Sequence, residues 1–547
     1  MATLSFKGKS FVQNHHLAVK YHQLIPKKEK SLTDKVSLND NLIIHGDNLK
    51  ALKALLPSYA GKVKCIYIDP PYNTGNEGWK YNDNVNSPMI QEWLGKVVDK
   101  EDLTRHDKWL CMMMPRLKLL RELLTDNGVI FISIDDNEVH HLKMLLDDIF
   151  QNNFIGCFIW RKKEGGGQTD DYFVTEHEYI LVYAKSISSF KWQDELVPLN
   201  EGQFNRKDEG GKFDLVKLEK WGTAARKEDR PKMAFAIKSP DGKNYYPKAP
   251  DGSDGRWRVG SLTMERLLSN NLVHWEKKNG GWVPYEKVYF VEGSVKKLKE
   301  RSIIYELVNT GDASNELKNI FGVKDIFENP KPSELIKYFL TYTTDTNSII
   351  LDSFSGSGTT SHAVLSLNKE DGGNRKFILV ECEDYADKIT AERVRRVIKG
   401  VPGAKDEKLK NGLGGSFSYF ELGEPIEMQS ILEGKNLPSY IDLARYVFYT
   451  ATGEEFLQDK VKEAKHFIGE TKDYEVYLFY KPDLDYLKST ALTLDIAKSL
   501  GEIKSKKKLV FAPAKYLDLN DTELLTKHGL KDIEYCQLPF EIYKLRD

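Results

Sequence analysis

Apolar residues along this chain follow two alternating periods, one typical of buried strands and one typical of helices. Short apolar runs at residues 41–45, 62–68 and 129–135 predict strands. Leucines at helical spacing predict helices over residues 49–56 and 109–124. Strands that alternate with helices predict an α/β fold, with a mostly parallel sheet covered by helices on both faces.

The second predicted helix carries signals for its own limits. Pro115 predicts a kink or a start within residues 109–124, and Gly128 predicts the end of the helix before the next strand. The methionines at 112–114 fit core packing better than a ligand set. Further elements follow from the same patterns: a helix at 138–150, strands at 154–160 and 177–185, a helix at 331–344, a strand at 348–354, a helix from 359 and a strand at 376–382.

Changes in residue composition and in the apolar pattern divide the chain into four segments. Between residues 187 and 325, glycine, lysine, tryptophan and turn dipeptides dominate, which indicates an inserted domain. A glycine-rich linker at 410–416 leads into a last region without a chemical motif. We therefore predict a first α/β part, an insertion, a second α/β part and a C-terminal domain, at residues 1–186, 187–325, 326–400 and 415–547.

Composition narrows the class of protein. The 547 residues allow two to four domains, and the five cysteines contain no C-x-x-C pair, which argues against disulfides and against a zinc site. A formal net charge of -1 gives no general attraction to polyanions, so any nucleic acid must meet a local basic face. Neither an export signal nor a membrane span is visible, and we expect a cytoplasmic protein.

A glycine-rich turn, LDSFSGSGTT, lies between a predicted strand and a predicted helix. Gly356 and Gly358 allow the backbone to turn tightly and approach a ligand. Such turns serve NAD, FAD, nucleotides and S-adenosylmethionine (SAM) alike, but this one lacks the third dinucleotide glycine and the P-loop lysine. Glu381, at the end of the next strand, is placed to accept both hydroxyls of a ribose.

A second motif, Asp69-Pro70-Pro71-Tyr72, ends another predicted strand. The prolines fix the backbone and hold the Asp69 carboxylate and the Pro70 carbonyl as two acceptors. Two acceptors aimed at one point match an exocyclic NH₂ group, and Tyr72 offers a face on which a planar base stacks, worth about 1–3 kcal/mol. The motif therefore predicts a pocket that holds a nucleobase by its amine.

Together these motifs resemble the amino-methyltransferases of DNA, with Phe354, Gly356 and Gly358 matching the F-x-G-x-G loop. The order of the motifs resembles the beta group, a circular permutation of the SAM-dependent methyltransferase (Rossmann-like) fold. Over about residues 40–395, the chain is similar to the modification (Mod) subunit of type III restriction-modification systems. The stretches that carry this likeness are YIDPPYNTGN, HDKWLCMMMPRL, GVIFISIDDNE, EYILVYAK, RPKMAFAI, GRWRV and LDSFSGSGTT.

The resemblance implies that SAM is the cofactor and assigns residues to it. Asp352 would bind the methionine amino group, Glu381 the ribose and Asp47 the adenine edge, and Lys331 and Pro332 begin the helix that closes over the methionine end. The full set implied for SAM is Asp47, Asn48, Lys331, Pro332, Asp352, Phe354, Gly356, Gly358, Thr359 and Glu381. Ser353 and Val259 depart from residues common in the family, proline and tryptophan respectively.

The resemblance also implies the reaction. Asp69, Pro70, Pro71 and Tyr72 would grip an adenine swung out of duplex DNA, and its N6 would attack the SAM methyl group in line, with no metal and no covalent intermediate. An aspartate at the first motif position favours adenine over cytosine-N4. The alternatives are a stand-alone adenine or cytosine-N4 methyltransferase, a non-catalytic DNA-recognition subunit, and methylation of RNA or protein.

Partners are implied in the same way. The insertion at 187–325 occupies the place of the family's target-recognition domain and offers basic side chains for double-stranded DNA: Arg206, Lys207, Lys212, Lys217, Lys220, Arg226, Lys227, Arg230 and Lys232. The C-terminal domain is expected to support a homodimer or dock a restriction (Res) subunit. The basic segment at 160–167 and the lysines at 504–508 fit solvated loops or phosphate contacts, and the His140-His141 pair has no third ligand at metal spacing.

Overall fold

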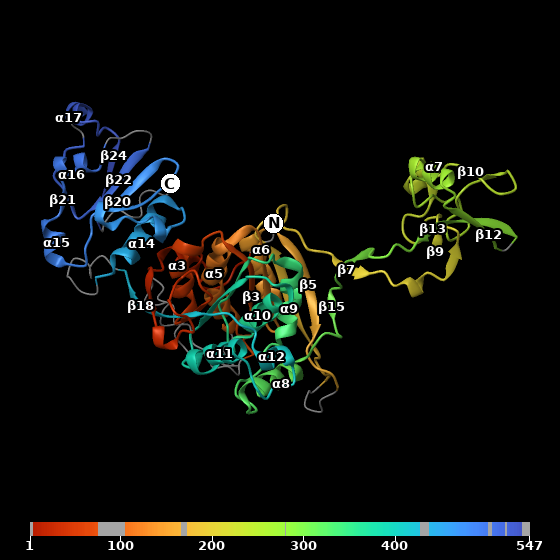
Figure 1. The fold of residues 1–547 in the computed structure, drawn as a ribbon, viewed down its shortest axis with the longest axis horizontal. Coiled ribbons are helices and arrows are strands. Elements are labelled where there is room, and N and C mark those ends of the chain that lie inside the picture. The colour runs from red at the N-terminus through yellow and green to blue at the C-terminus, as the bar shows by residue number, and fades with distance from the viewer. Residues whose placement is uncertain are drawn as a thin grey trace. The chain divides into compact units, whose positions relative to one another are not determined.

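The computed structural model separates into two units (Figure 1). One comprises Met1–Gln193 with Arg301–Asp547, and the other is Asp194–Glu300. The structure describes residues 4–74, 104–165, 172–278, 280–426, 437–501, 506–519 and 522–538. Residues 75–103 therefore lie outside the described residues, as do parts of the segments 160–167 and 504–508.

A ten-stranded sheet forms the centre of the larger unit, in the order β1-β18-β2-β17-β16-β3-β4-β6-β5-β15. The strands from β18 through β4 run parallel, β1 pairs antiparallel at one end, and β6 runs antiparallel to both of its neighbours. This arrangement confirms the predicted mostly parallel sheet. The strands are β1 His22–Pro26, β2 Leu42–His45, β3 Val63–Ile68, β4 Leu124–Ile134, β5 Phe154–Arg161, β6 His177–Ala184, β15 Ile303–Ile304, β16 Ile349–Asp352, β17 Lys376–Glu381 and β18 Ser418–Pro425.

Helices cover both faces of this sheet (Figure 1). On one face, α3, α5 and α6 share an apolar core with alternate residues of the strands, and on the other α9, α10 and α11 share a second core. The three-layer arrangement follows from strands that are apolar on both sides. The helices are α3 Asn48–Tyr59, α5 Arg105–Leu123, α6 Val139–Phe150, α8 Thr310–Phe321, α9 Ser333–Thr343, α10 Thr359–Asp371, α11 Glu392–Lys399 and α12 Glu407–Asn411, with short helices α1 Lys9–Val12 and α2 His15–Ala18.

The second predicted helix, over residues 109–124, is α5, but a start at Pro115 and an end at Gly128 are both wrong. Helix α5 already begins at Arg105 and contains Pro115 in its interior, and it ends at Leu123 rather than at Gly128. Strand β4 starts directly at Leu124, because Leu124 pairs with Val63 of β3 across an irregular register. Pairing with a distant strand, which local sequence does not reveal, therefore decides where this helix stops.

The register of the sheet brings the two sequence motifs to one edge. Strands β3 and β16 are adjacent and parallel, with Leu351 opposite Ile66. Asp69 follows the last residue of β3, and Ser353 follows the last residue of β16. Ligand sites in open parallel sheets lie at the carboxyl ends of the strands.

The C-terminal region adds a smaller sheet with its own core. Its strand order is β19-β20-β22-β24. Helix α14 packs against α3, one of the helices that cover the ten-stranded sheet. The first strand beyond residue 415, β18, belongs to the ten-stranded sheet. The elements are α14 Tyr440–Thr452, β19 Phe467–Glu470, β20 Tyr474–Leu478, α15 Leu484–Ser489, β21 Ala491–Leu492, α16 Leu494–Ser499, β22 Lys507–Ala512, β23 Ala514–Lys515, α17 Thr522–Lys527 and β24 Ile533–Gln537.

The smaller unit is built on the four-stranded sheet β12-β13-β9-β8 around a buried Trp257. It corresponds to the middle of the predicted insertion, since β15 and α8 from the region after residue 300 belong to the larger unit. Its elements are β7 Glu195–Pro198, β8 Arg206–Asp208, β9 Gly211–Lys217, β10 Ile237–Lys238, β11 Asn244–Tyr245, α7 Ser261–Ser269, β12 Val273–Lys278, β13 Gly281–Tyr289 and β14 Val295–Leu298. Among the helices described in either unit, none has the length and apolar character that a bilayer crossing requires.

Candidate active site

Asp69 lies at the centre of a buried group of charges at the end of β3. Its Oδ1 accepts a hydrogen bond from the Tyr72 hydroxyl at 2.8 Å, and its Oδ2 faces the Lys331 ammonium at 2.8 Å. The same ammonium lies 5.1 Å from the centre of the Tyr72 ring and 3.4 Å from Glu178. Pro70 is buried beneath this group, and the Pro71 carbonyl accepts a hydrogen bond from Trp109 Nε1 at 2.7 Å.

Glu178, on β6, is a member of this site that sequence reasoning missed. Its Oε2 accepts a bond from the Tyr72 hydroxyl at 3.0 Å, and its Oε1 faces Lys162 at 3.1 Å. The stretch EYILVYAK gave a strand, but nothing local showed that the acid at its start would meet Asp69. Antiparallel pairing of β6 with β4 places it there.

Burial and charge set the protonation states of this group. Burial raises the pKa of Asp69, Lys331 opposes the rise, and the charge of Glu178 adds to it. Burial also tends to raise the pKa of Glu178, but the positive charges of Lys331 and Lys162 outweigh it. The pKa of Glu178 is therefore lowered. The pKa of Lys331 is raised, because the two acids outweigh its burial. Two acids therefore share one buried ammonium, and Lys331 is the group that most opposes the rise in the pKa of Asp69.

The glycine-rich turn that follows β16 is shaped by its glycines. Gly356 has φ 49° and Gly358 has φ 80°, in the left-handed region that side chains disfavour. A Cβ on Gly356 would come within 3.0 Å of the Phe327 ring, and one on Gly358 within 3.2 Å of the Thr390 carbonyl oxygen. Only glycine fits both positions without a shift of the surroundings.

Two acids fasten this turn. Asp352 Oδ1 accepts from the Phe354 amide and its Oδ2 from the Thr360 hydroxyl, and burial raises the pKa of Asp352 to about 7. Glu381 Oε2 accepts from the Gly356 amide at 2.7 Å, and burial raises the pKa of Glu381. Both acids thus hold the backbone of the turn.

The turn after β2 joins the same edge of the sheet. Asn48 is buried, donates to the Ser353 carbonyl at 3.0 Å and accepts from Arg116 Nε at 2.6 Å. Asp47 caps helix α3 through the Lys50 amide and lies 3.5 Å from Arg116. Asn48 therefore ties the β2 turn to the glycine-rich turn.

Lys331 and Pro332, which directly precede α9, connect the two motifs. The Lys331 ammonium reaches Asp69, while its backbone carbonyl accepts from the Thr359 hydroxyl at 3.1 Å, at the start of α10. Pro332 is the residue before the first turn of α9. The residues expected at the methionine end of SAM therefore also contact the motif expected to hold the base.

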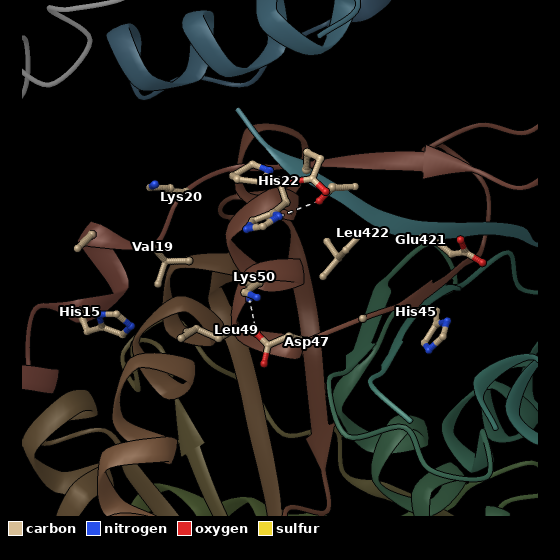
Figure 2. A pocket seen from close by; sticks show the side chains of 15 residues that line it. His15, Val19, Lys20, His22, His45, Asp47, Leu49, Lys50, Glu421 and Leu422 are labelled. Atoms are coloured by element: carbon tan, nitrogen blue, oxygen red, sulfur yellow. Dashed lines mark hydrogen bonds between the residues drawn. The ribbon is translucent and has the colours of Figure 1, made fainter. Parts of the chain in front are cut away.

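A hollow of about 830 Å³ opens beside Asp47 (Figure 2). Its walls come from the end of β2, the start of α3, the segment from α2 to β1, and β18. Figure 2 shows His22, Lys50 and Asp47 around this space, with the Asp47 carboxylate next to the start of α3. The lining includes neither Asp69 nor the turn at 354–358.

Comparison with known proteins gives the class. Residues 63–392 match a family model described as DNA methylase. The chain belongs to the DNA methylase family. The match spans both motifs, from the first residue of β3 to the first residue of α11.

Relatives of this DNA methylase include two type III proteins and one type II protein. The chain is 31% identical to the StyLTI Mod subunit of Salmonella typhimurium, over 78% of this chain and 66% of that protein. It is 34% identical to the EcoPI Mod subunit of Escherichia phage P1, over 68% of this chain and 64% of that one. It is 33% identical to the type II methyltransferase M.KpnI of Klebsiella pneumoniae, over 70% of this chain and 93% of that enzyme. The chain thus spans about two thirds of the length of these two Mod subunits.

Proposed function

We propose that this DNA methylase transfers a methyl group from SAM to the N6 amine of adenine in double-stranded DNA. The observation that carries the proposal is the buried group around Asp69, linked through Lys331 to the glycine-rich turn on the neighbouring strand. A base held at the first motif and a cofactor held at the second would lie at one edge of the sheet. The relatives named above, of both types, are modification proteins or methyltransferases.

The residues of the turn fit SAM. Ser353 and Ser355 have buried hydroxyls with no hydrogen-bond partner among the described residues, and the glycines bring backbone close to the space above the turn. Under this proposal Asp352 meets the methionine amino group, Glu381 the ribose, and Asp47 the adenine edge next to its hollow. When bound, SAM supplies a methyl group on a positive sulfur, which is already activated for transfer.

Asp69 and Pro70 would act on the amine of the base. The lone pair of an exocyclic amine is drawn into the ring, so the nitrogen is a weak nucleophile. Hydrogen bonds from its two hydrogens to the Asp69 carboxylate and the Pro70 carbonyl favour a pyramidal nitrogen and return density to it. Tyr72, fixed by Asp69 and Glu178, presents its ring as the stacking face. Swinging the base out of the duplex costs a few kcal/mol, which these contacts offset.

We further infer that the protein is the Mod subunit of a type III restriction-modification system, with a Res partner and a homodimeric assembly. The identities to two Mod subunits support this inference. Unit Asp194–Glu300 would read the DNA sequence. Coexpression with a type III Res subunit, followed by copurification, tests the partnership, and the molar mass of the complex in solution tests the dimer.

A second candidate function is a stand-alone modification methyltransferase. The 93% coverage of M.KpnI favours it, because almost the whole of that type II enzyme aligns with this chain. The second candidate acts on adenine or on the N4 amine of cytosine, and it differs from the first in having no Res partner. Association with Res therefore decides between them.

Methyl transfer itself is tested with radiolabelled SAM and unmodified genomic DNA. We expect label in N6-methyladenine, and we expect Asp69→Ala to abolish transfer while SAM binding stays intact. Label in N4-methylcytosine would change the base assigned, and label in RNA or protein offered in parallel would change the substrate class. Wild-type protein that binds DNA and transfers no label would indicate a recognition subunit without activity.

A further inference from the structure

The residue that directly follows the Asp69–Tyr72 motif, Asn73, is buried and has a strained backbone conformation. Asn73 has φ 58°, in the left-handed region, and its side chain is fully buried. Its side-chain nitrogen Nδ2 donates a hydrogen bond to Glu138 Oε1 at 2.5 Å. A non-glycine residue in this conformation costs on the order of 1 kcal/mol or more and persists only where its surroundings hold it. The bond to the fully buried Glu138 is one contact that holds Asn73.

Glu138 is itself fully buried and lies between two histidines. His106, in the first turn of α5, places Nδ1 2.6 Å from Glu138 Oε1, and His141, in the first turn of α6, places Nδ1 3.0 Å from Oε2. The two rings are 4.7 Å apart between centroids. The negative charge of the nearby Glu138 carboxylate raises the pKa of His141, which favours a positive histidine beside the buried acid. Sequence spacing showed no third ligand for the His140-His141 pair, because His106 comes from a different helix, whereas Glu138 directly precedes α6.

The same three side chains would suit a metal ion by type, since their ligand atoms lie within 4.8 Å of one another. The hydrogen bonding points the other way. Arg105 Nε donates to His106 Nε2 at 3.3 Å, so the ring proton is on Nδ1 and points at Glu138. A metal on Nδ1 would require the proton on Nε2. The 2.6 Å separation is also a hydrogen-bond length, shorter than the roughly 3.3 Å between two ligands each about 2 Å from one metal.

We propose that Glu138 is a positioning residue for methyl transfer, acting through Asn73 to fix the Asp69–Tyr72 motif in its productive conformation. The inference rests on the proposed function. Trp109 holds the middle of the motif through the Pro71 carbonyl, and Glu138 holds its exit. The two prolines limit the backbone locally, but these two contacts set its direction relative to the sheet. His106 places Nδ1 against one oxygen of the buried carboxylate, and His141 lies 3.0 Å from the other oxygen, so the buried acid has a partner on each side.

Glu138→Ala tests the proposal, with Asp136→Ala as its matched control in the same turn. Asp136 is exposed, and the contact recorded for it is with Tyr179 rather than with the motif. We expect Glu138→Ala to lower kcat about 10- to 100-fold, the range for a small misplacement of a reacting group, with SAM affinity within twofold of wild type. Glu138→Gln, which keeps an acceptor for Asn73, should recover part of the loss. Equal loss of kcat and SAM affinity, or no loss, would overturn the proposal.

Hydrogen exchange gives a readout that does not depend on activity. In Glu138→Ala we expect faster exchange of the amides at 72–74 and unchanged exchange at 349–358. Faster exchange throughout β4 and α6 would indicate general destabilisation and would overturn the positioning role. If the wild-type protein transfers no methyl group, the proposed function fails, while this measurement still decides whether Glu138 holds the motif.

A double-mutant cycle and a chelator complete the test. If Glu138 acts through Asn73, Glu138→Ala should cost no further activity in an Asn73→Ala background, and additive losses would contradict the pathway. Activity should also be unaffected by 1,10-phenanthroline and by added Zn²⁺. Inactivation by the chelator, reversed by zinc, would show that the three residues bind a metal and would overturn the proposal.

Discussion

Replacing Lys331 by methionine should shift the pH dependence of methyl transfer toward alkaline values. Lys331 is 2.8 Å from Asp69 and 3.4 Å from Glu178, and its side chain is only 9% exposed. Burial already raises the pKa of Asp69, and Lys331 is the main group that opposes the rise. Without the ammonium, Asp69 loses the main group that opposes the rise in its pKa caused by burial and by the charge of Glu178, while Glu178 keeps Lys162 at 3.1 Å.

The magnitude follows from burial and from the acid's role. Breaking a buried ion pair by removing one partner costs about 3–5 kcal/mol of folding stability, and the low end is expected because Asp69 is 27% exposed. For activity, each unit by which the pKa of Asp69 rises above the assay pH lowers the fraction of carboxylate about tenfold. We therefore expect kcat at pH 7 to fall about tenfold or more and to recover as the pH is raised.

The assay is a pH profile of single-turnover methyl transfer for the wild type, Lys331→Met and Lys331→Arg. Lys337→Met serves as a control on α9, the helix that follows Lys331, since Lys337 pairs with Glu334 and Glu370 and does not contact Asp69. Lys331→Arg keeps the charge and should keep the acidic limb of the profile. A Lys331→Met enzyme with normal kcat and an unshifted acidic limb would refute the role given to Lys331.

Three further outcomes are expected. SAM affinity should fall as the pH drops through about 7, because burial raises the pKa of Asp352 to about 7 and the protonated acid loses its attraction for the methionine ammonium; calorimetry across pH 6–8 checks this, and a flat profile contradicts it. Gly358→Ala should weaken SAM binding about tenfold or more. Gly372→Ala, at an open helix end with a similar φ, should leave SAM binding unchanged. Equilibrium dialysis measures both affinities, and equal effects of the two variants would refute the steric argument. Arg230 and Lys232 are exposed, and replacing both by alanine should lower the DNA affinity and reduce the dependence of log affinity on log salt concentration by about 2. Arg206→Ala should change this dependence less, because the charge of Arg206 is paired with Glu276. An unchanged salt dependence in the double variant would show that this segment does not contact DNA.

The local sequence pattern determined the class of fold and the two motifs of the candidate site. The alternation of apolar runs gave the parallel sheet, and the stretches around Asp69 and Gly356 carried the family, since each consists of neighbouring residues whose chemistry is legible in the sequence. The same reasoning failed at the end of α5, where pairing between Leu124 and Val63 replaced the stop expected at Gly128. Helix ends respond to tertiary pairing as well as to their own residues.

Only the tertiary structure decided which distant side chains complete the site. Lys331 meets Asp69 across 262 positions of the chain, and Glu178 and Glu138 reach the motif from a different strand and from the turn before a different helix. Their stretches look like ordinary strand and helix sequence, because a charged residue at the end of an element is usually solvated. Strand order and register bury these charges together, and burial is what converts surface-type residues into groups that set the charge and direction of Asp69.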